Sequence, residues 1–210
     1  MKKYILACVF IVVAMLCIAE GAGKSSKKTY KIGDEGEGGG IVFYVSKEGF
    51  KVYDGKGGSV VCHYLEMSKD TLGESFWFYE YSNIGIKKTQ LGYGKANTYK
   101  ILNAKTSKRL TEESCAAYRC SKYSTPSTKA GEWWLPSKDE LNLMYKNQGD
   151  AVLETSTCMN ETYRGWYWSS SESDQYNACC KNFYDGDHHN EQKYNEIEGS
   201  MYSVRAVRAF

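Results

Sequence analysis

Residues 131–145, with the sequence GEWWLPSKDELNLMY, constrain the fold more than any other stretch of this chain. The two adjacent tryptophans must bury on opposite faces of an extended segment, and Pro136 blocks its continuation. Ser137 and Glu140 have the spacing of a capping box, in which each side chain accepts the backbone N–H of the other residue. The stretch therefore predicts a strand end that turns into a capped helix.

The first residues have the pattern of an export signal. Two lysines precede an apolar run, residues 4–16, that is too short for a membrane span and is followed by small residues. We expect residues 1–19 to be a signal peptide and residues 20–29 a polar tether, with no transmembrane segment after cleavage. The expected location is the periplasm, the cell surface or the medium. The alternatives are an uncleaved anchor and a lipoprotein modified at Cys17.

Six cysteines lie outside the expected signal peptide, and in an oxidising compartment they can form up to three disulfides of undetermined connectivity. They are Cys62, Cys115, Cys120, Cys158, Cys179 and Cys180. We expect at least two disulfides. Cys115 and Cys120 should not be bonded to each other, because a helix through both would turn the second cysteine away from the first.

The charges of the chain are nearly balanced, with 27 basic and 25 acidic residues. Two of the basic residues lie in the expected signal peptide, so the exported chain has no net excess of positive charge. Nucleic-acid binding requires a strongly basic surface. We therefore expect no nucleic-acid partner.

Hydrophobic periodicity and turn residues predict the other elements. Strands are expected at residues 41–45, 50–53, 59–66, 165–171, 178–184 and 201–210. Helices are expected at residues 97–105 and 111–120, with a single broken helix as the alternative. Residues 46–49 should form a hairpin turn, and residues 71–93 a long irregular loop. The last strand breaks its alternation, so we expect a bulge or burial on both faces.

Six blocks of sequence together resemble one known family. The blocks are IGDEGEGGGIVFYV, YLE, GKANTYKI, WWLPSKDELNLMY, WYWSSSE and the terminal VRAVRAF. In this order and spacing they resemble the C-terminal domain of the Legionella collagen-like adhesin, a bacterial domain of unknown function. That family is similar to the C-type-lectin-like variants of bacterial surface proteins and formylglycine-generating enzymes. The resemblance implies one α+β domain over residues 30–210, with paired terminal strands, two helices and long irregular loops that carry the ligand face.

Two tryptophans near the middle of this domain are candidates for ligand binding. Trp166 and Trp168 lie two apart on a predicted strand and share one face, with Tyr167 on the other. Such a pair can stack on a sugar ring, and the guanidinium of Arg164 can pair with a sulfate or carboxylate. We predict Arg164, Trp166 and Trp168 as ligand-binding residues. The alternative is that the tryptophans belong to the core.

We predict neither a metal nor a cofactor. His188 and His189 lie beside Asp185 and Asp187, but adjacent side chains point apart and the acid spacing of a calcium loop is not met. A solvated turn is the better interpretation. The calcium-site tripeptides of sugar-binding C-type lectins, Glu-Pro-Asn and Trp-Asn-Asp, are absent. The glycine-rich run at residues 30–40 precedes a strand instead of opening a helix, which argues against a nucleotide site.

The adjacent cysteines Cys179 and Cys180 invite comparison with the paired catalytic cysteines of formylglycine-generating enzymes. That chemistry needs two thiols in one cleft, whereas neighbours on a strand face opposite ways. We therefore expect structural cysteines and no catalytic residue. His63 has no triad-like pattern around it and is expected to be structural as well.

These observations together favour an exported, non-enzymatic, lectin-like module for binding or adhesion at the bacterial surface. Its partner would be a glycan or a host or matrix protein, and the oligomeric state is left open. The alternatives are an enzyme of the formylglycine-generating type and a structural envelope protein without a discrete ligand.

Overall fold

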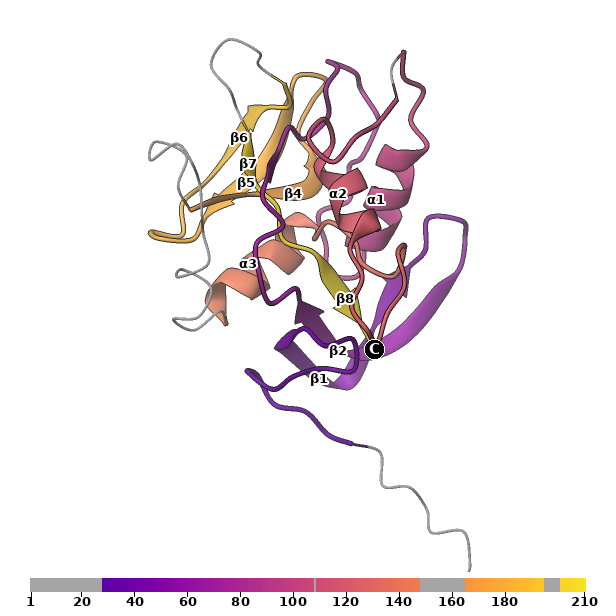
Figure 1. The fold of residues 1–210 in the computed structure, drawn as a ribbon, viewed down its shortest axis with the longest axis vertical. Coiled ribbons are helices and arrows are strands. Elements are labelled where there is room, and N and C mark those ends of the chain that lie inside the picture. The colour runs from indigo at the N-terminus through magenta and orange to yellow at the C-terminus, as the bar shows by residue number, and fades with distance from the viewer. Residues whose placement is uncertain (1–27, 108, 148–164, 195–200) are drawn as a thin grey trace, which may run out of the picture.

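The computed structural model describes residues 28–107, 109–147, 165–194 and 201–210, and the described residues form a mixed α+β fold (Figure 1). The strands are β1 (Ile41–Tyr53), β2 (Ser59–Met67), β3 (Glu74–Ser75), β4 (Trp166–Glu172), β5 (Asn177–Asn182), β6 (His188–Gln192), β7 (Tyr202–Ser203) and β8 (Val207–Ala209). The helices are α1 (Gly94–Leu102), α2 (Ala116–Lys122) and α3 (Lys138–Lys146). The predicted signal peptide, Cys158 and Arg164 lie outside the described residues.

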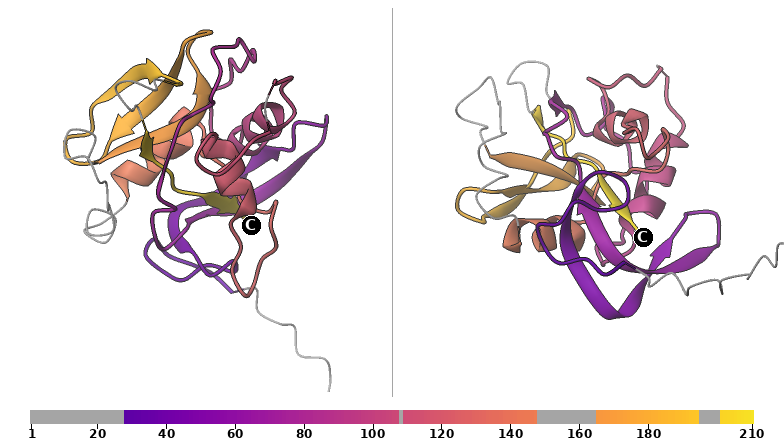
Figure 2. Two further views of the ribbon diagram at one scale, coloured as in Figure 1. Left: turned by 45° about the horizontal axis from the view of Figure 1, so that its top comes forward. Right: turned by 60° about the horizontal axis from the view of Figure 1, so that its bottom comes forward.

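The strands form two sheets, which the C-terminal segment joins (Figure 2). The smaller sheet has the order β1-β2-β8, and the larger has the order β3-β7-β4-β5-β6. Residues 202–207 are buried throughout, which confirms the predicted burial on both faces. β8 pairs with β2, so β2 separates the first strand from the last. The pairing of first and last strands that the resemblance implied is therefore wrong, and there are three described helices instead of two.

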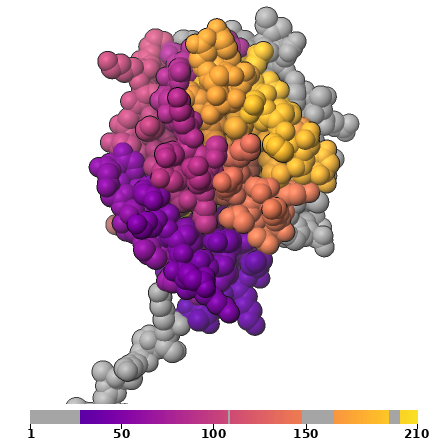
Figure 3. All heavy atoms as spheres, turned by 180° about the vertical axis from the view of Figure 1, so that it is seen from behind, coloured from indigo at the N-terminus to yellow at the C-terminus, as the bar shows by residue number. Residues whose placement is uncertain are grey.

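The organising segment folds as its sequence predicts. Trp133 packs in one hydrophobic cluster and Trp134 in the other, on opposite faces of the chain. Trp134 and Val207 also form an isolated antiparallel bridge, in which the N–H of each residue donates to the carbonyl of the other, at 3.0 and 2.9 Å. The capping box is present, because the Ser137 N–H donates to Glu140 Oε2 at 2.9 Å and the Glu140 N–H to Ser137 Oγ at 3.3 Å. α3 then lies between the β1–β2 hairpin and strands β4 and β5 (Figure 3).

α1 begins at Gly94, three residues before the predicted start at residue 97. The Asn97 amide does not cap the helix, since it donates instead to the Lys88 carbonyl at 2.8 Å. The Glu140 carboxylate takes that role, because Glu140 Oε1 accepts the N–H groups of Gly92 and Gly94 at 2.9 and 3.3 Å. The buried Glu140 side chain therefore accepts backbone N–H groups at the start of both α1 and α3.

The predicted helix over residues 111–120 forms only in part. The Thr111 N–H donates to Ser114 Oγ at 2.8 Å, and the Ser114 N–H donates to Thr111 Oγ1 at 3.1 Å. This reciprocal pair fixes a turn, and α2 begins after it at Ala116, with Cys115 at its N-cap. α1 and α2 are therefore separate helices.

The predicted hairpin turn at residues 46–49 is wrong. β1 runs through these residues as one strand, and the register jumps from Val45 opposite Tyr64 to Phe50 opposite Cys62. Residues 46–49 thus bulge out opposite a single residue of β2. The reversal comes later, where Asp54 Oδ1 accepts two backbone N–H groups in the turn between β1 and β2.

The remaining elements match the prediction in part, and β3 and β6 are additional strands. The strands expected at residues 59–66, 165–171 and 178–184 correspond to β2, β4 and β5. The loop expected at residues 71–93 contains the short strand β3 and is otherwise irregular. The single strand expected at residues 201–210 forms instead as β7 and β8, which belong to different sheets. The histidines expected in a solvated turn instead belong to β6, the edge strand of the larger sheet. Tyr30 is buried against the rings of Tyr64 and Phe210, so the two ends of the described chain meet.

The described cysteines are buried thiols. Cys62, Cys115, Cys120, Cys179 and Cys180 are all free. Two disulfides would require at least one bond between described cysteines, so the structure does not form the two that we expected.

Candidate functional site

Three buried glutamates hold the loops of the described fold in place. They are Glu66, Glu140 and Glu172. Each accepts hydrogen bonds from backbone N–H groups of a glycine-containing loop that is distant in sequence. Such bonds compensate for the loss of hydration when a carboxylate is buried. The loops are consequently fixed by side chains of the sheets and of α3.

Glu66 explains the glycine-rich run near the start of the domain. Its carboxylate accepts the N–H groups of Gly38 and Gly40, each at 2.9 Å, and pairs with Arg208 Nη1 at 2.6 Å. A Cβ atom at Gly38 would lie 2.4 Å from Glu66 Oε1, so only glycine allows this approach. The run therefore wraps a carboxylate, a role that sequence analysis did not find.

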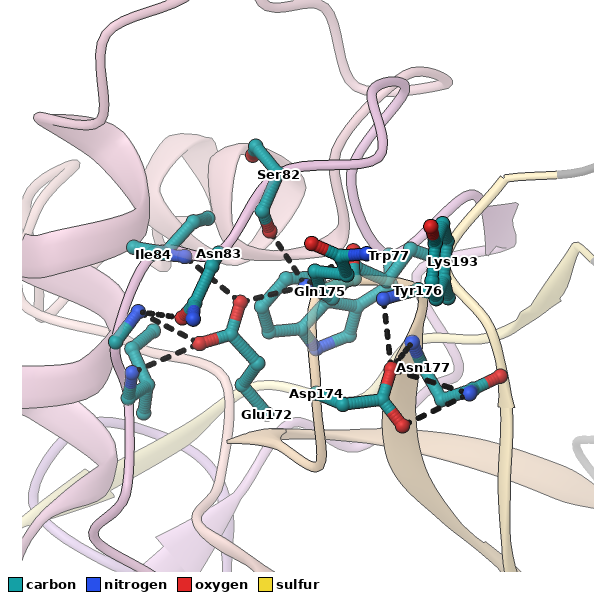
Figure 4. Close-up of polar contacts among 12 residues, drawn as sticks. Trp77, Ser82, Asn83, Ile84, Glu172, Asp174, Gln175, Tyr176, Asn177 and Lys193 are labelled. Carbon is teal, nitrogen blue, oxygen red and sulfur yellow. Dashed lines mark hydrogen bonds and ion pairs between the residues drawn. The ribbon is translucent and has the colours of Figure 1, made fainter.

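Glu172 is the centre of the most developed cluster (Figure 4). Its Oε1 atom accepts the Ile84 N–H at 2.8 Å, and its Oε2 atom accepts the N–H groups of Gly85 and Ile86 at 2.7 and 2.9 Å. The same carboxylate pairs with Lys193 Nζ at 2.5 Å. Three consecutive amides of the loop are therefore bound to the end of β4.

The Lys193 ammonium is completely enclosed, with 0% of the residue exposed. Besides Glu172, it donates to the carbonyl oxygens of Ser82 and Gln175 at 2.8 and 3.3 Å, and it lies 4.9 Å from the centre of the Trp77 ring. Burial lowers the pKa of Lys193, while the Glu172 carboxylate acts in the opposite direction. All three N–H groups have acceptors, so this pair is suited to clamp the loop rather than to transfer protons.

A cleft opens above this clamp, between the loop and the turn that joins β4 to β5. It has a volume of about 540 Å³, and its lining includes Asn83, Lys87, Glu172, Asp174 and Tyr176. The turn is as firmly fixed as the loop, because Asp174 Oδ1 accepts the N–H groups of Tyr176 and Asn177 at 2.7 and 2.8 Å. The cleft is therefore preformed on both sides.

Two tyrosines in contact with each other, Tyr81 and Tyr176, lie at the edge of this cleft. Tyr81 is 48% exposed and Tyr176 is 51% exposed, and their rings meet edge to face at 5.6 Å. The Tyr81 hydroxyl donates to the Tyr194 carbonyl, which anchors that ring. Exposed rings beside a polar cleft can stack on the apolar face of a ligand.

The tryptophans predicted to bind a ligand lie elsewhere. Trp168 is only 1% exposed and its indole N–H donates to the Ser75 carbonyl at 2.8 Å, so it belongs to the core, which is the alternative that the sequence left open. Trp166 is half-buried, and its ring is covered by those of His189 and Tyr202, at 4.0 and 5.9 Å. Trp168 is therefore unsuited to stack on a sugar, and Arg164 lies outside the described residues.

The structure also separates the two adjacent histidines that the sequence did not favour as metal ligands. The His189 ring packs on Trp166. His188 instead lines a pocket together with Lys138 and Lys181. The two histidines therefore face opposite sides of β6, as adjacent residues in an extended segment should. Within the described residues, no group of three or more histidine, cysteine and acidic side chains could hold a metal ion.

The cysteines and the remaining histidine have structural surroundings. Cys179 donates to Asn190 Oδ1 at 3.3 Å and Cys180 to the His189 carbonyl at 3.4 Å. Burial raises the pKa of both thiols, which makes them poor nucleophiles at neutral pH. His63 Nδ1 lies 2.9 Å from the Ser46 carbonyl oxygen, a contact that steadies the bulge in β1.

Comparison with known proteins assigns no family. No protein-family model matches this chain, and no curated protein does either.

Sequence analysis missed the clamp and the tyrosine pair. Glu172 ends the block WYWSSSE, but its amide partners lie 86 to 88 residues earlier and its cation 21 residues later. The usable signal was the glycine at residue 85 within an aromatic loop, since glycine readily adopts the positive φ of 77° that the loop has there. In a chain with 18 tyrosines, pattern alone does not single out Tyr81 and Tyr176.

Proposed function

We propose that this chain is an exported, lectin-like binding or adhesion module that acts at the bacterial surface. Its ligand face would be the cleft between residues 83–87 and residues 173–176, together with the rings of Tyr81 and Tyr176. The partner would be a glycan or a host or matrix protein. The proposal also includes the C-type-lectin-like assignment and the relation to the collagen-like adhesin family, which rest on the six sequence blocks.

The observation that carries the proposal is the preformed cleft above the Glu172–Lys193 clamp. Loops that are ordered before binding lose little conformational entropy when a ligand arrives. Here the three loop amides held by Glu172 and the turn held by Asp174 fix both walls. Binding sites commonly combine such walls with exposed aromatic rings and a few polar groups.

Two features of the described residues weigh against the alternatives. The formylglycine-generating type of enzyme needs two reactive thiols in one cleft, whereas Cys180 lines the pocket beside His188 and both Cys179 and Cys180 have pKa values raised by burial. A purely structural protein has no need of a polar cleft flanked by two half-exposed tyrosines. Neither feature depends on the resemblance.

The test is a screen of glycans and matrix proteins, followed by variants of the cleft. Tyr176→Ala should weaken binding to any partner found by about tenfold or more, because it removes an exposed aromatic contact. Tyr184→Ala is the matched control, since Tyr184 is 47% exposed and lies in the turn after β5. Circular dichroism establishes that both variants fold. Equal affinity of the two variants for the partner would exclude this cleft as the binding face.

A further inference from the structure

A second cleft lies away from the loop cleft, between the β1–β2 turn, α1 and the tryptophan pair. Its volume is about 490 Å³, which is within the range of small-molecule sites. One face of α1 forms a wall, because Lys95, Thr98, Tyr99 and Leu102 follow the i, i+3, i+4, i+7 spacing. Asp54 and Lys56 also line the cleft, and the almost completely buried Trp133 and Trp134 lie at its base.

Two lysines at this cleft place their ammonium groups beside aromatic rings. The Lys56 ammonium lies 5.3 Å from the centre of the Tyr99 ring, and the Lys95 ammonium lies 5.6 Å from the Trp134 ring. Neither lysine takes part in an ion pair within the described part of the chain. The Tyr99 and Trp134 rings thus make cation–π contacts with the two ammonium groups.

Asp54 offsets only part of this positive charge, because the hydrogen bond from the Lys56 N–H and the nearby Lys56 ammonium both lower the pKa of its carboxyl. It is the only acidic residue among the described lining residues. Its Oδ1 atom accepts the N–H groups of Lys56 and Gly58 at 2.7 and 2.9 Å, so its carboxylate is directed into its own turn. The described lining therefore carries two ammonium groups and one carboxylate, which leaves it with a net positive charge.

The walls of this cleft are held together independently of any ligand. The Tyr53 N–H donates to the Gly92 carbonyl at 2.9 Å, and the rings of Tyr53 and Tyr93 stack at 4.3 Å. These contacts join the end of β1 to the start of α1. At Gly55, where φ is 78°, a Cβ atom would lie 2.8 Å from Tyr99 Cδ1, so the turn packs directly on that ring. The site is consequently preorganised.

The geometry points to this cleft as a binding site for a small organic anion with a flat apolar body, such as an aromatic carboxylate. Lys56 and Lys95 would pair with the anionic group, while the partly exposed side chains of Tyr99 and Leu102 would contact the ring. This inference does not depend on the proposed function, which concerns a different cleft.

The test is a titration of the ¹⁵N-tryptophan-labelled protein followed by NMR, with the Trp134 indole N–H as reporter. The probes are 4-hydroxybenzoate, its uncharged counterpart 4-hydroxybenzamide, and glucuronate, which is an anion without an aromatic face. We expect saturable shifts of the Trp134 signal with 4-hydroxybenzoate and much weaker binding of the other two. No shift at millimolar 4-hydroxybenzoate, or equal binding of the amide, would overturn the inference. Equal binding of glucuronate would overturn the requirement for a flat apolar body.

Lysine variants then test which cations are responsible. Lys56→Gln and Lys95→Gln should each weaken 4-hydroxybenzoate binding by about threefold, and the double variant by about tenfold, as expected for partly exposed ion pairs. Lys100→Gln is the matched control, because Lys100 is exposed on α1 but does not line this cleft. An equal loss in the control would show a non-specific charge effect and would overturn the inference. Because the two lysines lie on different elements, one variant still decides the question if the other fails to fold.

Discussion

Glu66, Glu140 and Glu172 bury their carboxylates where backbone N–H groups converge. Glu66 and Glu172 each pair with a cation, Arg208 and Lys193, whereas the described partners of Glu140 are neutral donors. A buried charge that loses its partner is strongly destabilising, while an exposed pair contributes little. The buried carboxylates should therefore be among the most sensitive residues of the fold.

Glu172→Gln should lower the free energy of unfolding by about 3–5 kcal/mol, because it leaves the Lys193 ammonium buried without a counter-charge. The new amide NH₂ group would also face N–H donors of the loop. Urea denaturation followed by tryptophan fluorescence measures the change.

The matched control is Glu35→Gln, which removes an exposed ion pair with Lys69. It should change stability much less than Glu172→Gln does. The double variant Glu172→Gln/Lys193→Met should recover part of the loss, since no unpaired charge remains buried. Equal effects of Glu172→Gln and Glu35→Gln would contradict the clamp.

Glu140 makes stability depend on pH in a direction that its burial determines. Burial raises the pKa of Glu140 above its ordinary value of 4.5. The folded state then binds the Glu140 proton more tightly than the unfolded state does. The stability that protonated Glu140 contributes is therefore complete below about pH 4.5 and is lost as the pH rises through the folded-state pKa. The unfolding free energy of the wild type minus that of Glu140→Gln should therefore fall as the pH rises above 4.5. Urea denaturation over a pH series tests this, and a difference that rises with pH would contradict it.

At the scale of elements, the sequence predicted correctly those features that depend on residues close together in the chain. The capping box of α3 depends on two residues three apart, and it formed as expected. The start of α1 depends on Glu140, which lies 46 residues from Gly94, and no local pattern reveals that contact. Likewise, Gly49 has the positive φ of a turn, but pairing with β2 makes its segment a bulge. Long-range hydrogen bonds, which a sequence pattern does not contain, account for these errors.

The candidate site shows the same limit. The shared face of Trp166 and Trp168 was predictable from alternation along β4, and the two side chains do face one cluster. The face that meets solvent was not predictable, because it depends on rings from β6 and β7 of the same sheet that lie against Trp166 and Trp168. Tyr81 and Tyr176 come from two loops that meet only in the folded chain.

The cysteines of α2 and β5 give a direct test of these elements. Burial raises the pKa of Cys115 to about 12 and also raises those of Cys120, Cys179 and Cys180. We expect these four thiols to resist a thiol-specific reagent in the native protein and to react fully after denaturation. Peptide mapping after labelling identifies each residue. A disulfide-linked peptide that joins any two of them would contradict the structure.

At the scale of the whole molecule, the proposed location depends on export. We expect the exported form to begin between residues 20 and 24, because two lysines, an apolar run and small residues precede that point. Intact-mass analysis of envelope protein measures the mature start. A mature form that still carries residues 1–16 would contradict the expectation, and a diacylglyceryl mass on Cys17 would indicate a lipoprotein.

The central claim is that the cleft above the Glu172–Lys193 clamp is preformed and binds the ligand. Hydrogen–deuterium exchange, measured with and without a partner from the screen, tests both parts. The amides of Ile84, Gly85 and Ile86 should exchange slowly in the free protein, because Glu172 accepts all three. Added partner should slow exchange further in residues 83–87 and 173–176. Fast exchange of the three amides in the free protein, or protection confined to other segments, would contradict the claim.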